Sequence, residues 1–367
     1  MQQNSRGGVA GRSGDEIAGG IDRRQVVASI AAAISTLALP TPGAKAAAEP
    51  PFRIDLHHHV LPPKWIDAAR TKKPDNTWGP EIVGWTPAIS IEQMDKHRIA
   101  YAVTELGLPG VWWAPPDEAA SLARYCNDYV ADMQRTYPGR FGMFATIPLP
   151  HVDVTLKEIE YAYDTLHADG IGLITSYGPL WPGDQAFAPV WQELNRRRAV
   201  IHVHPTVPTC CVNLIPDVAN ATDEYLFDTA RAITSLLFSG TLTRYPDLRF
   251  IFSHAGGAFP DIADRVTGSA SRNPKIAARL PGGDPYAVLH KLYFDIASSV
   301  NPINFDGLRH FTSIDRIVVG TDLPYVHMDY TLDPLDHAHL SAKDYGRINT
   351  GNALDLFPQL KGRIATK

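Results

Sequence analysis

Cysteine is scarce in this chain, with three residues in 367. Three cysteines cannot form the set of bridges that staples a small secreted domain, so that class of protein is excluded. Runs of Lys and Arg are also missing from the bulk of the chain, and the formal net charge is -5. This balance argues against nucleic acid or an anionic membrane surface as the main partner. No apolar run reaches the roughly 20 residues of a membrane-spanning helix.

The length and composition favour an enzyme-sized α/β domain. At about 100–200 residues per domain the chain would hold two domains, but α/β barrels are longer as single units. The chain is 44% hydrophobic, enough for a large core without disulfide bonds. No G-x-G-x-x-G motif follows a candidate strand, and this absence argues against a dinucleotide-binding fold.

The first 46 residues resemble an export signal. Arg23 and Arg24 precede an apolar stretch over residues 26–39, and small residues over 44–48 offer a cleavage site. The arginine pair is typical of a twin-arginine (Tat) signal, although Asp22 and Val26 depart from the usual residues. An Ala-rich helix with an accidental arginine pair is the alternative. We therefore predict a signal peptide over residues 1–46, a periplasmic location and one domain over residues 47–367.

Short apolar runs alternate with amphipathic helical stretches along the rest of the chain. Eight such runs are candidate strands, and several are continuous runs of Val, Ile and Phe, as expected for parallel strands covered by helices. The runs are Arg53–His57, Tyr101–Leu106, Phe141–Ile147, Ile171–Thr175, Val200–His204, Phe250–His254, Leu292–Ile296 and Ile317–Thr321. Eight strand-then-helix units predict a TIM-type (β/α)8 barrel, with an open doubly wound sheet as the alternative.

The first candidate strand ends in three consecutive histidines. Alternate residues of a strand point to the same side, so His57 and His59 share a face while His58 points away. Two imidazoles on one face can chelate a divalent metal ion. His58 is expected to pack between the strand and a helix.

Three further strands also end in candidate ligands. His204 ends the fifth, His254 ends the sixth and Asp322 ends the eighth. The carboxyl ends of barrel strands meet at one mouth, so these side chains would join His57 and His59 in one small volume. Nitrogen and carboxylate ligands of this kind suit Zn²⁺, with Mn²⁺ or Fe²⁺ as alternatives. His202 lies one step deeper, and we expect a core or supporting role for it.

Aromatic and cysteine side chains follow several strands. Trp112 and Trp181 lie on loops after the second and fourth strands, where they could stack on an aromatic ring or pack a lid or dimer interface. Cys210 and Cys211 follow the fifth strand, and adjacent cysteines rarely pair because the ring is strained. We therefore expect them to pack in the loop as thiols, and Cys126 to lie in a helix core.

The pattern resembles the amidohydrolase superfamily, in the branch that contains aminocarboxymuconate-semialdehyde decarboxylase. The resemblance runs from Ile54 to about Phe357. Its most specific pieces are Asp55–Pro63 (DLHHHVLPP), Val203–Thr206 (VHPT), Phe252–Pro260 (FSHAGGAFP) and Gly320–Tyr325 (GTDLPY). Within the branch the chain is most similar to the 6-methylsalicylate decarboxylase type, on the stretches RFGMFATIPLP, ADGIGLITSYG, ELNRRRAVIHVHPT and LLFSGTLTRYPDLRFIFSHAGG.

The resemblance implies a role for each strand-end residue. One divalent metal ion would be held by four of them, with His254 beside the metal site or substrate. Arg265 matches an arginine that contacts the substrate carboxylate in the branch, sometimes across a subunit interface, and relatives are often homodimers. Alternatively, Arg265 forms a salt bridge on a helix face. The four ligands implied are His57, His59, His204 and Asp322.

Two departures narrow the expected activity. The segment Ala88–Asp95 has no arginine where the branch's founding enzyme has a second substrate-binding arginine, which argues against a dicarboxylate substrate. The fourth strand has no lysine that could be carbamylated, which favours a mononuclear site.

The sequence thus predicts a metal-dependent, non-oxidative decarboxylase of a hydroxybenzoate-like (salicylate-type) acid. The metal would chelate the substrate through its ortho-hydroxyl and carboxylate, and Asp322 would protonate the ring carbon. His254 would stabilise developing charge. A metal-dependent hydrolase of a lactone, ester or amide uses the same residues and is the alternative. A non-catalytic binder of metal or ligand is a third reading, and the complete ligand set argues against it.

Overall fold

The computed structural model describes residues 52–70, 72 and 78–364, which belong to one compact unit. The predicted signal peptide, residues 1–46, lies outside these described residues. No helix among the described residues is long and apolar enough to cross a bilayer.

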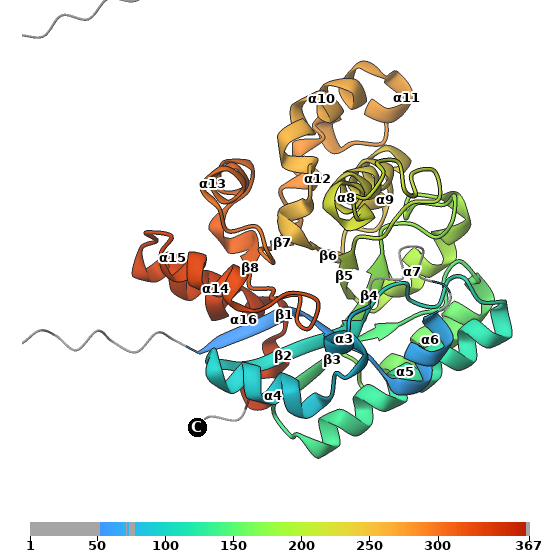
Figure 1. Ribbon diagram of the computed structural model, residues 1–367. Coiled ribbons are helices and arrows are strands. Elements are labelled where there is room, and N and C mark those ends of the chain that lie inside the picture. The colour runs from blue at the N-terminus through green and yellow to red at the C-terminus, as the bar shows by residue number, and fades with distance from the viewer. Residues whose placement is uncertain (1–51, 71, 73–77, 365–367) are drawn as a thin grey trace, which may run out of the picture. The chain divides into compact units, whose positions relative to one another are not determined.

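Eight parallel strands form one sheet whose spatial order follows the chain, from β1 to β8 (Figure 1). Backbone bonds from Leu56 N to Val319 O (2.9 Å) and from His59 N to Leu323 O (2.7 Å) join the last strand's segment to the first. The sheet therefore curls into a nearly closed barrel, and the predicted (β/α)8 fold is confirmed. The strands are β1 Arg53–Val60, β2 Ile99–Leu106, β3 Phe141–Thr146, β4 Gly170–Ile174, β5 Val200–His204, β6 Arg249–Phe252, β7 Tyr293–Asp295 and β8 Ile317–Val318.

Helices follow the strands and cover the outside of the barrel (Figure 1). Several are capped by side chains: Thr86 accepts a hydrogen bond from Ile89 N at the start of α4, and Asn301 accepts two at the start of α13. The α-helices are α2 Pro63–Ala69, α3 Pro80–Val83, α4 Pro87–Lys96, α5 Pro116–Thr136, α6 Val152–Asp164, α7 Ala188–Arg196, α8 Asn220–Ser239, α9 Thr241–Arg244, α10 Phe259–Arg272, α11 Pro274–Ala277, α12 Tyr286–Leu289, α13 Pro302–Phe311, α14 Asp329–Asp336, α15 Ala342–Gly346 and α16 Asn352–Leu356.

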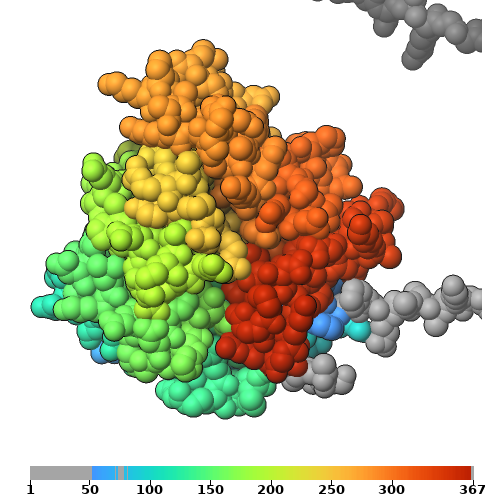
Figure 2. All heavy atoms as spheres, turned by 180° about the vertical axis from the view of Figure 1, so that it is seen from behind, coloured from blue at the N-terminus to red at the C-terminus, as the bar shows by residue number. Residues whose placement is uncertain are grey.

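Short turns of other helix types complete the described chain. The 3₁₀ segments are η1 Gln185–Phe187, η2 His254–Gly256, η3 Pro281–Gly283, η4 Ile314–Arg316 and η6 Pro358–Gly362, and η5 Arg347–Gly351 is a π-helix. Seen from behind, the C-terminal residues lie together on the face turned to the viewer (Figure 2, red).

The barrel interior changes from apolar to ionisable along β2 and β5. On β2, Tyr101 and Val103 belong to an apolar cluster inside the barrel, and the next residue of the same parity is Glu105. On β5, Val200 belongs to that cluster and His202 and His204 follow at the same parity. The apolar half is closed by side chains of the C-terminal segment, so the ionisable half is left to form a site at the strands' carboxyl ends.

Two strands end two or three residues earlier than the sequence suggested. The strand predicted to reach His254 ends at Phe252, and the strand predicted to reach Thr321 ends at Val318. In both cases the backbone then turns through the left-handed region, with φ of 52° at His254 and 63° at Asp322. Few residues other than glycine adopt this conformation, although Asp and His are enriched in it, and it is found at functional sites. The turns carry both side chains over the barrel mouth.

Candidate metal centre and active site

Four of the predicted residues meet at the mouth of the barrel. His57, His59 and His204 come from β1 and β5, and Asp322 follows β8; all four are buried. The Nε2 atoms of His57 and His59 are 3.1 Å apart. Asp322 Oδ1 lies 2.9 Å from His59 Nε2, 3.4 Å from His57 Nε2 and 3.9 Å from His204 Nε2. The four donor atoms therefore surround one small volume.

Histidine hydrogen bonds turn the Nε2 atoms of two ligands toward that volume. His57 Nδ1–H donates to Asp295 Oδ2 at 3.0 Å, and His204 Nδ1–H donates to the Pro205 carbonyl at 2.8 Å. The Nε2 atom of each ring then faces the other donors, and His204 Nε2 is buried without any hydrogen-bond partner. Ligands about 2.0–2.1 Å from a tetrahedral ion lie roughly 3.4 Å apart, close to the spacing observed. The donor set fits a divalent metal ion.

Burial and neighbouring charges set the protonation of these groups. Burial lowers the pKa of His59 to about 4, which keeps the imidazole neutral and able to act as a ligand. Burial alone would raise the pKa of Asp322, but the surrounding histidines, His57 first, hold it well below its usual value. Burial alone would lower the pKa of His57, but Asp295 and Asp322 raise it well above its usual value, so this ring must release a proton when its Nε2 binds a metal.

His254 lies beside the four donors. Its Nδ1–H donates to the Ala297 carbonyl at 3.0 Å, which turns Nε2 toward Asp322 Oδ2, 3.8 Å away. Burial lowers the pKa of His254. His57, His204, His254 and Asp322 form one of the groups whose ligand atoms are close enough to share a metal, and His57, His59, Glu105 and His204 form another.

Sequence reasoning missed two buried acids below the donors. Asp295, at the end of β7, accepts from His57, and Glu105, on β2, accepts from His202 Nδ1 at 2.9 Å. Each lies in a strand that the sequence predicted, at or next to its carboxyl end, which was the available signal. In the sequence, a single acid at such a position cannot be distinguished from a surface residue, because its hydrogen-bond partners are known only from the structure.

A cavity of about 440 Å³ opens above the donors. Its walls carry aromatic, aliphatic and small polar side chains, and no Lys or Arg in the described part of the chain lines it. The lining residues are Leu108, His204, Ala219, Ala221, Thr222, Tyr225, Leu226, His254, Ser298, Ser299, Asn304, Asp322, Tyr325 and Val326.

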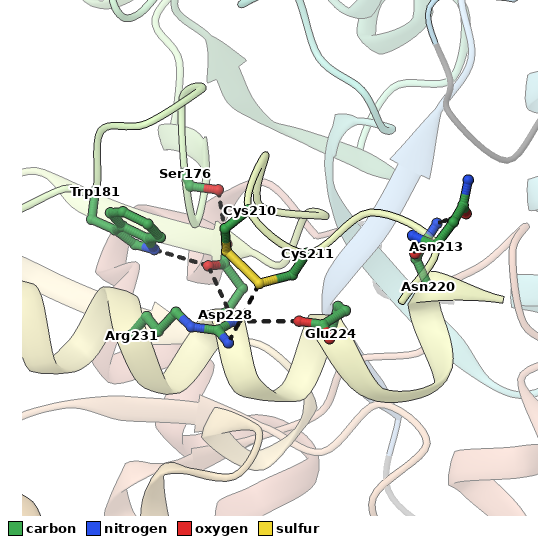
Figure 3. The surroundings of a disulfide bond; sticks show 9 residues. All are labelled: Ser176, Trp181, Cys210, Cys211, Asn213, Asn220, Glu224, Asp228 and Arg231. Atoms are coloured by element: carbon green, nitrogen blue, oxygen red, sulfur yellow. Dashed lines mark hydrogen bonds and ion pairs between the residues drawn. A yellow bond between two sulfur atoms is a disulfide. The ribbon is translucent and has the colours of Figure 1, made fainter. Parts of the chain in front are cut away.

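Three predicted substrate contacts lie elsewhere. Arg265 is exposed on α10 and does not line the cavity. Trp112 lines a separate, smaller cavity beside Glu105. Trp181 Nε1–H donates to Asp228 at 2.8 Å, which fixes the loop after β4 to α8 (Figure 3). Within this one subunit, none of the three reaches the cavity over the donors.

The adjacent cysteines form a disulfide, contrary to expectation. Cys210 and Cys211 are joined in the loop between β5 and α8 (Figure 3). The backbone turns tightly here, with Cys211 N donating to the Pro208 carbonyl at 3.0 Å, and this turn brings the two side chains to the same side. The prediction of two packed thiols was therefore wrong. Cys126 is a buried free thiol on α5, as predicted, and His58 packs against Ser90 of α4.

Comparison with known proteins identifies the family. The sequence profile described as Amidohydrolase matches residues 54–359. The chain belongs to the amidohydrolase family. It is 36% identical to the decarboxylase yanB of Aspergillus niger over 292 residues, covering 74% of this chain and 77% of that protein. It is 33% identical to the 6-methylsalicylic acid decarboxylase of Penicillium expansum, covering 84% and 97%.

Solved structures confirm the fold of this amidohydrolase. A protein titled amidohydrolase II is 26% identical, with a TM-score of 0.76, covering 83% of this chain and 99% of that one. A 2,6-dihydroxybenzoate decarboxylase from Rhizobium shares the fold at 21% identity, with a TM-score of 0.70 over 84% and 99% of the two chains.

These relatives confirm one prediction and overturn another. The predicted enzyme class, a carboxy-lyase of the amidohydrolase superfamily, is confirmed, because the relatives at 32–36% identity are decarboxylases. The predicted periplasmic location is wrong, because these same relatives are fungal proteins, from Aspergillus and Penicillium. The arginine pair and apolar stretch that suggested export lie outside the part of the chain that the structure describes.

Proposed function

We propose that this amidohydrolase is a metal-dependent, non-oxidative decarboxylase of a hydroxybenzoate-like acid. The observation that carries the proposal is a donor set of three histidines and a carboxylate at the floor of a cavity that no described Lys or Arg lines. An aromatic carboxylate entering this cavity meets no Lys or Arg from residues 52–70, 72 and 78–364. A metal ion is therefore the group that would neutralise its charge.

His57, His59, His204 and Asp322 would hold the ion. Zn²⁺ suits imidazole and carboxylate ligands, and Mn²⁺ is the second candidate. A related-fold decarboxylase from Polaromonas was solved with bound manganese. When bound, the ion would supply a Lewis acid for the carboxylate and ortho-hydroxyl of the substrate.

The cavity walls would hold the ring of the substrate. Tyr225, Leu226 and Tyr325 line it and offer apolar surface, and the Tyr325 ring also packs edge-on against His59, with centroids 4.9 Å apart. Ser298 and Asn304 would bond polar substituents. The volume of about 440 Å³ is within the range of small-molecule sites.

Asp322 would deliver the proton that the reaction consumes. The bond between the ring carbon and the carboxyl carbon breaks, its electron pair stays on the ring carbon, and that carbon takes a proton as CO₂ leaves. Because its pKa is low, Asp322 must first receive a proton. His254 Nε2, 3.8 Å from Asp322 Oδ2 and lining the cavity, would pass one from solvent.

We also propose a homodimer, with Arg265 of one subunit acting at the cavity of the other. Apolar side chains are exposed on the loop after β5 and on α8, beside the cavity, and they support this proposal. They are Val212, Leu214, Ile215, Val218, Leu226 and Phe227. Sedimentation of the wild type and of Phe227→Asp tests it. A wild-type monomer would contradict the dimer.

A substrate panel tests the reaction. We expect CO₂ from salicylates such as 6-methylsalicylate, and none from benzoates that lack the ortho-hydroxyl. Lactones and carboxylic esters test the hydrolase alternative, which no observation here favours. Hydrolysis of these compounds without any CO₂ from the salicylates would overturn the proposal.

A further inference from the structure

His202 lies between two buried carboxylates below the metal site. Its Nδ1 is 2.9 Å from Glu105 Oε2, and its Nε2 is 2.9 Å from Asp295 Oδ2. All three side chains are nearly or completely buried. Phe144 stacks on the imidazole, with ring centroids 5.4 Å apart and planes 20° from parallel. The ring is therefore held in one orientation by contacts on both edges and one face.

Asp295 connects His202 to the first metal ligand. The same oxygen that faces His202 accepts from His57 Nδ1–H at 3.0 Å. The other oxygen accepts from the backbone N–H groups of His254 and Ala297 at 3.1 and 3.0 Å. A carboxylate that accepts from a ligating histidine fixes its tautomer and ring orientation.

Glu105 faces a second metal ligand, His59, as Asp295 faces His57. Its Oε1 and the Nδ1 of His59 are both buried and without a hydrogen-bond partner, and they face each other across 3.9 Å. A donor and an acceptor left open at this distance need only a small shift to bond. Because His59 Nε2 faces the metal volume, that bond would orient His59 as Asp295 orients His57.

We propose that His202 is a positioning residue that holds both carboxylates in place for the metal ligands. It acts on His57 through Asp295, by a chain of two formed hydrogen bonds. His202 also holds Glu105 in the position where the second carboxylate oxygen of Glu105 faces His59. The inference rests on the metal site of the proposed function. It adds that metal affinity depends on a residue that contacts neither the ion nor the substrate.

Two variants test separately the hydrogen bonds made by the two ring nitrogens of His202. The amide nitrogen of glutamine reaches the place of Nε2, so His202→Gln keeps a donor to Asp295. The amide nitrogen of asparagine reaches the place of Nδ1, so His202→Asn keeps a donor to Glu105 and loses Asp295. Loss of support for a ligating histidine costs about 10–100-fold in metal affinity. We expect that loss for His202→Asn and a smaller one for His202→Gln.

The measurement is Co²⁺ binding, followed by visible absorption and by competition with a chelator. Thermal unfolding of the metal-free proteins shows whether each variant folds. Phe144→Leu is the matched control, because it loosens packing on the ring without changing either hydrogen bond. Asp295→Asn should weaken Co²⁺ binding as His202→Asn does. The double variant should be weakened less than the product of the two single effects, because both break one chain of bonds.

The outcomes distinguish this inference from the proposed function. A wild-type protein that binds no metal overturns both. A wild type that binds, with His202→Asn binding equally well and giving the same Co²⁺ spectrum, overturns the positioning role alone. Equal weakening by His202→Asn, His202→Gln and Phe144→Leu would also overturn it, because that result shows only a loss of packing.

Discussion

Replacing Asp55 with alanine should destabilise the barrel where its last strand meets its first. The Asp55 carboxylate is fully buried and accepts four hydrogen bonds. One oxygen accepts from the backbone N–H groups of His57 and Thr321, each at 3.1 Å. The other accepts from the Thr321 hydroxyl at 2.6 Å and from His58 Nδ1–H at 3.1 Å. The carboxylate thus ties a ligand-bearing strand to the residue before Asp322.

The size of the effect follows from the donors left behind. The Thr321 hydroxyl can rotate, the His58 ring can change tautomer, and the Thr321 N–H keeps the His57 carbonyl as an acceptor at 3.2 Å. The backbone N–H of His57 cannot turn away, and a buried donor without a partner costs about 1–3 kcal/mol, which is the loss we expect. Folded domains are stable by about 5–15 kcal/mol, so Asp55→Ala should remain folded at low temperature with a measurable part of its stability lost.

Urea unfolding of the metal-free protein, followed by circular dichroism, measures this loss. Thr321→Val removes one of the four bonds and should cost about 0.5–1.5 kcal/mol. Asp67→Ala is the control, because Asp67 is an exposed acid on α2, and it should shift the free energy of unfolding by less than about 0.5 kcal/mol. Unfolding of Asp55→Ala at the same urea concentration as Asp67→Ala would show that the Asp55 carboxylate does not stabilise the barrel.

Four further results are expected. Asp322→Asn should fold normally and lose about 10²–10⁴-fold in CO₂ release, because it lacks the carboxyl that carries the proton; near wild-type turnover would remove Asp322 from that role. His254→Gln should slow CO₂ release while metal content, measured by mass spectrometry, stays unchanged; loss of the metal would make it a ligand instead. Phe227→Asp should shift a sedimenting dimer to monomer, with exposed Asp67→Ala as the unchanged control. The bonds to Arg196 and Arg197 lower the pKa of Glu193 from 4.5 to about 2. These bonds therefore stabilise the fold above pH about 4.5, and the contribution is lost as the pH falls toward 2. Glu193→Gln should reduce the loss of unfolding free energy over this pH range by about 1 kcal/mol or less, because the pair is partly exposed.

The sequence was sufficient for the barrel because each strand is a dense apolar run with a helical stretch after it. It also located His57, His59, His204 and Asp322, because barrel topology brings every strand's carboxyl end to one mouth. No geometric detail was needed for that step.

The supporting acids and the loops needed three-dimensional contacts. Glu105 and Asp295 are single acids in apolar strands, and their importance comes from histidines on other strands. Trp181 is bonded to Asp228, more than 40 residues away, in place of the substrate contact that its loop position suggested. The pairing of Cys210 with Cys211 depends on a tight local turn.

The central claim is that the metal held by this histidine cluster drives loss of CO₂ from a salicylate-type acid. The most direct test measures CO₂ from 6-methylsalicylate with the purified protein, after chelator treatment and after reloading with Zn²⁺ or Mn²⁺, beside His204→Ala. We expect release that stops on chelation, returns on reloading and is absent in His204→Ala. Release that continues at full rate in the metal-free protein, or no release from any metal-loaded form, would show that the metal does not drive this reaction.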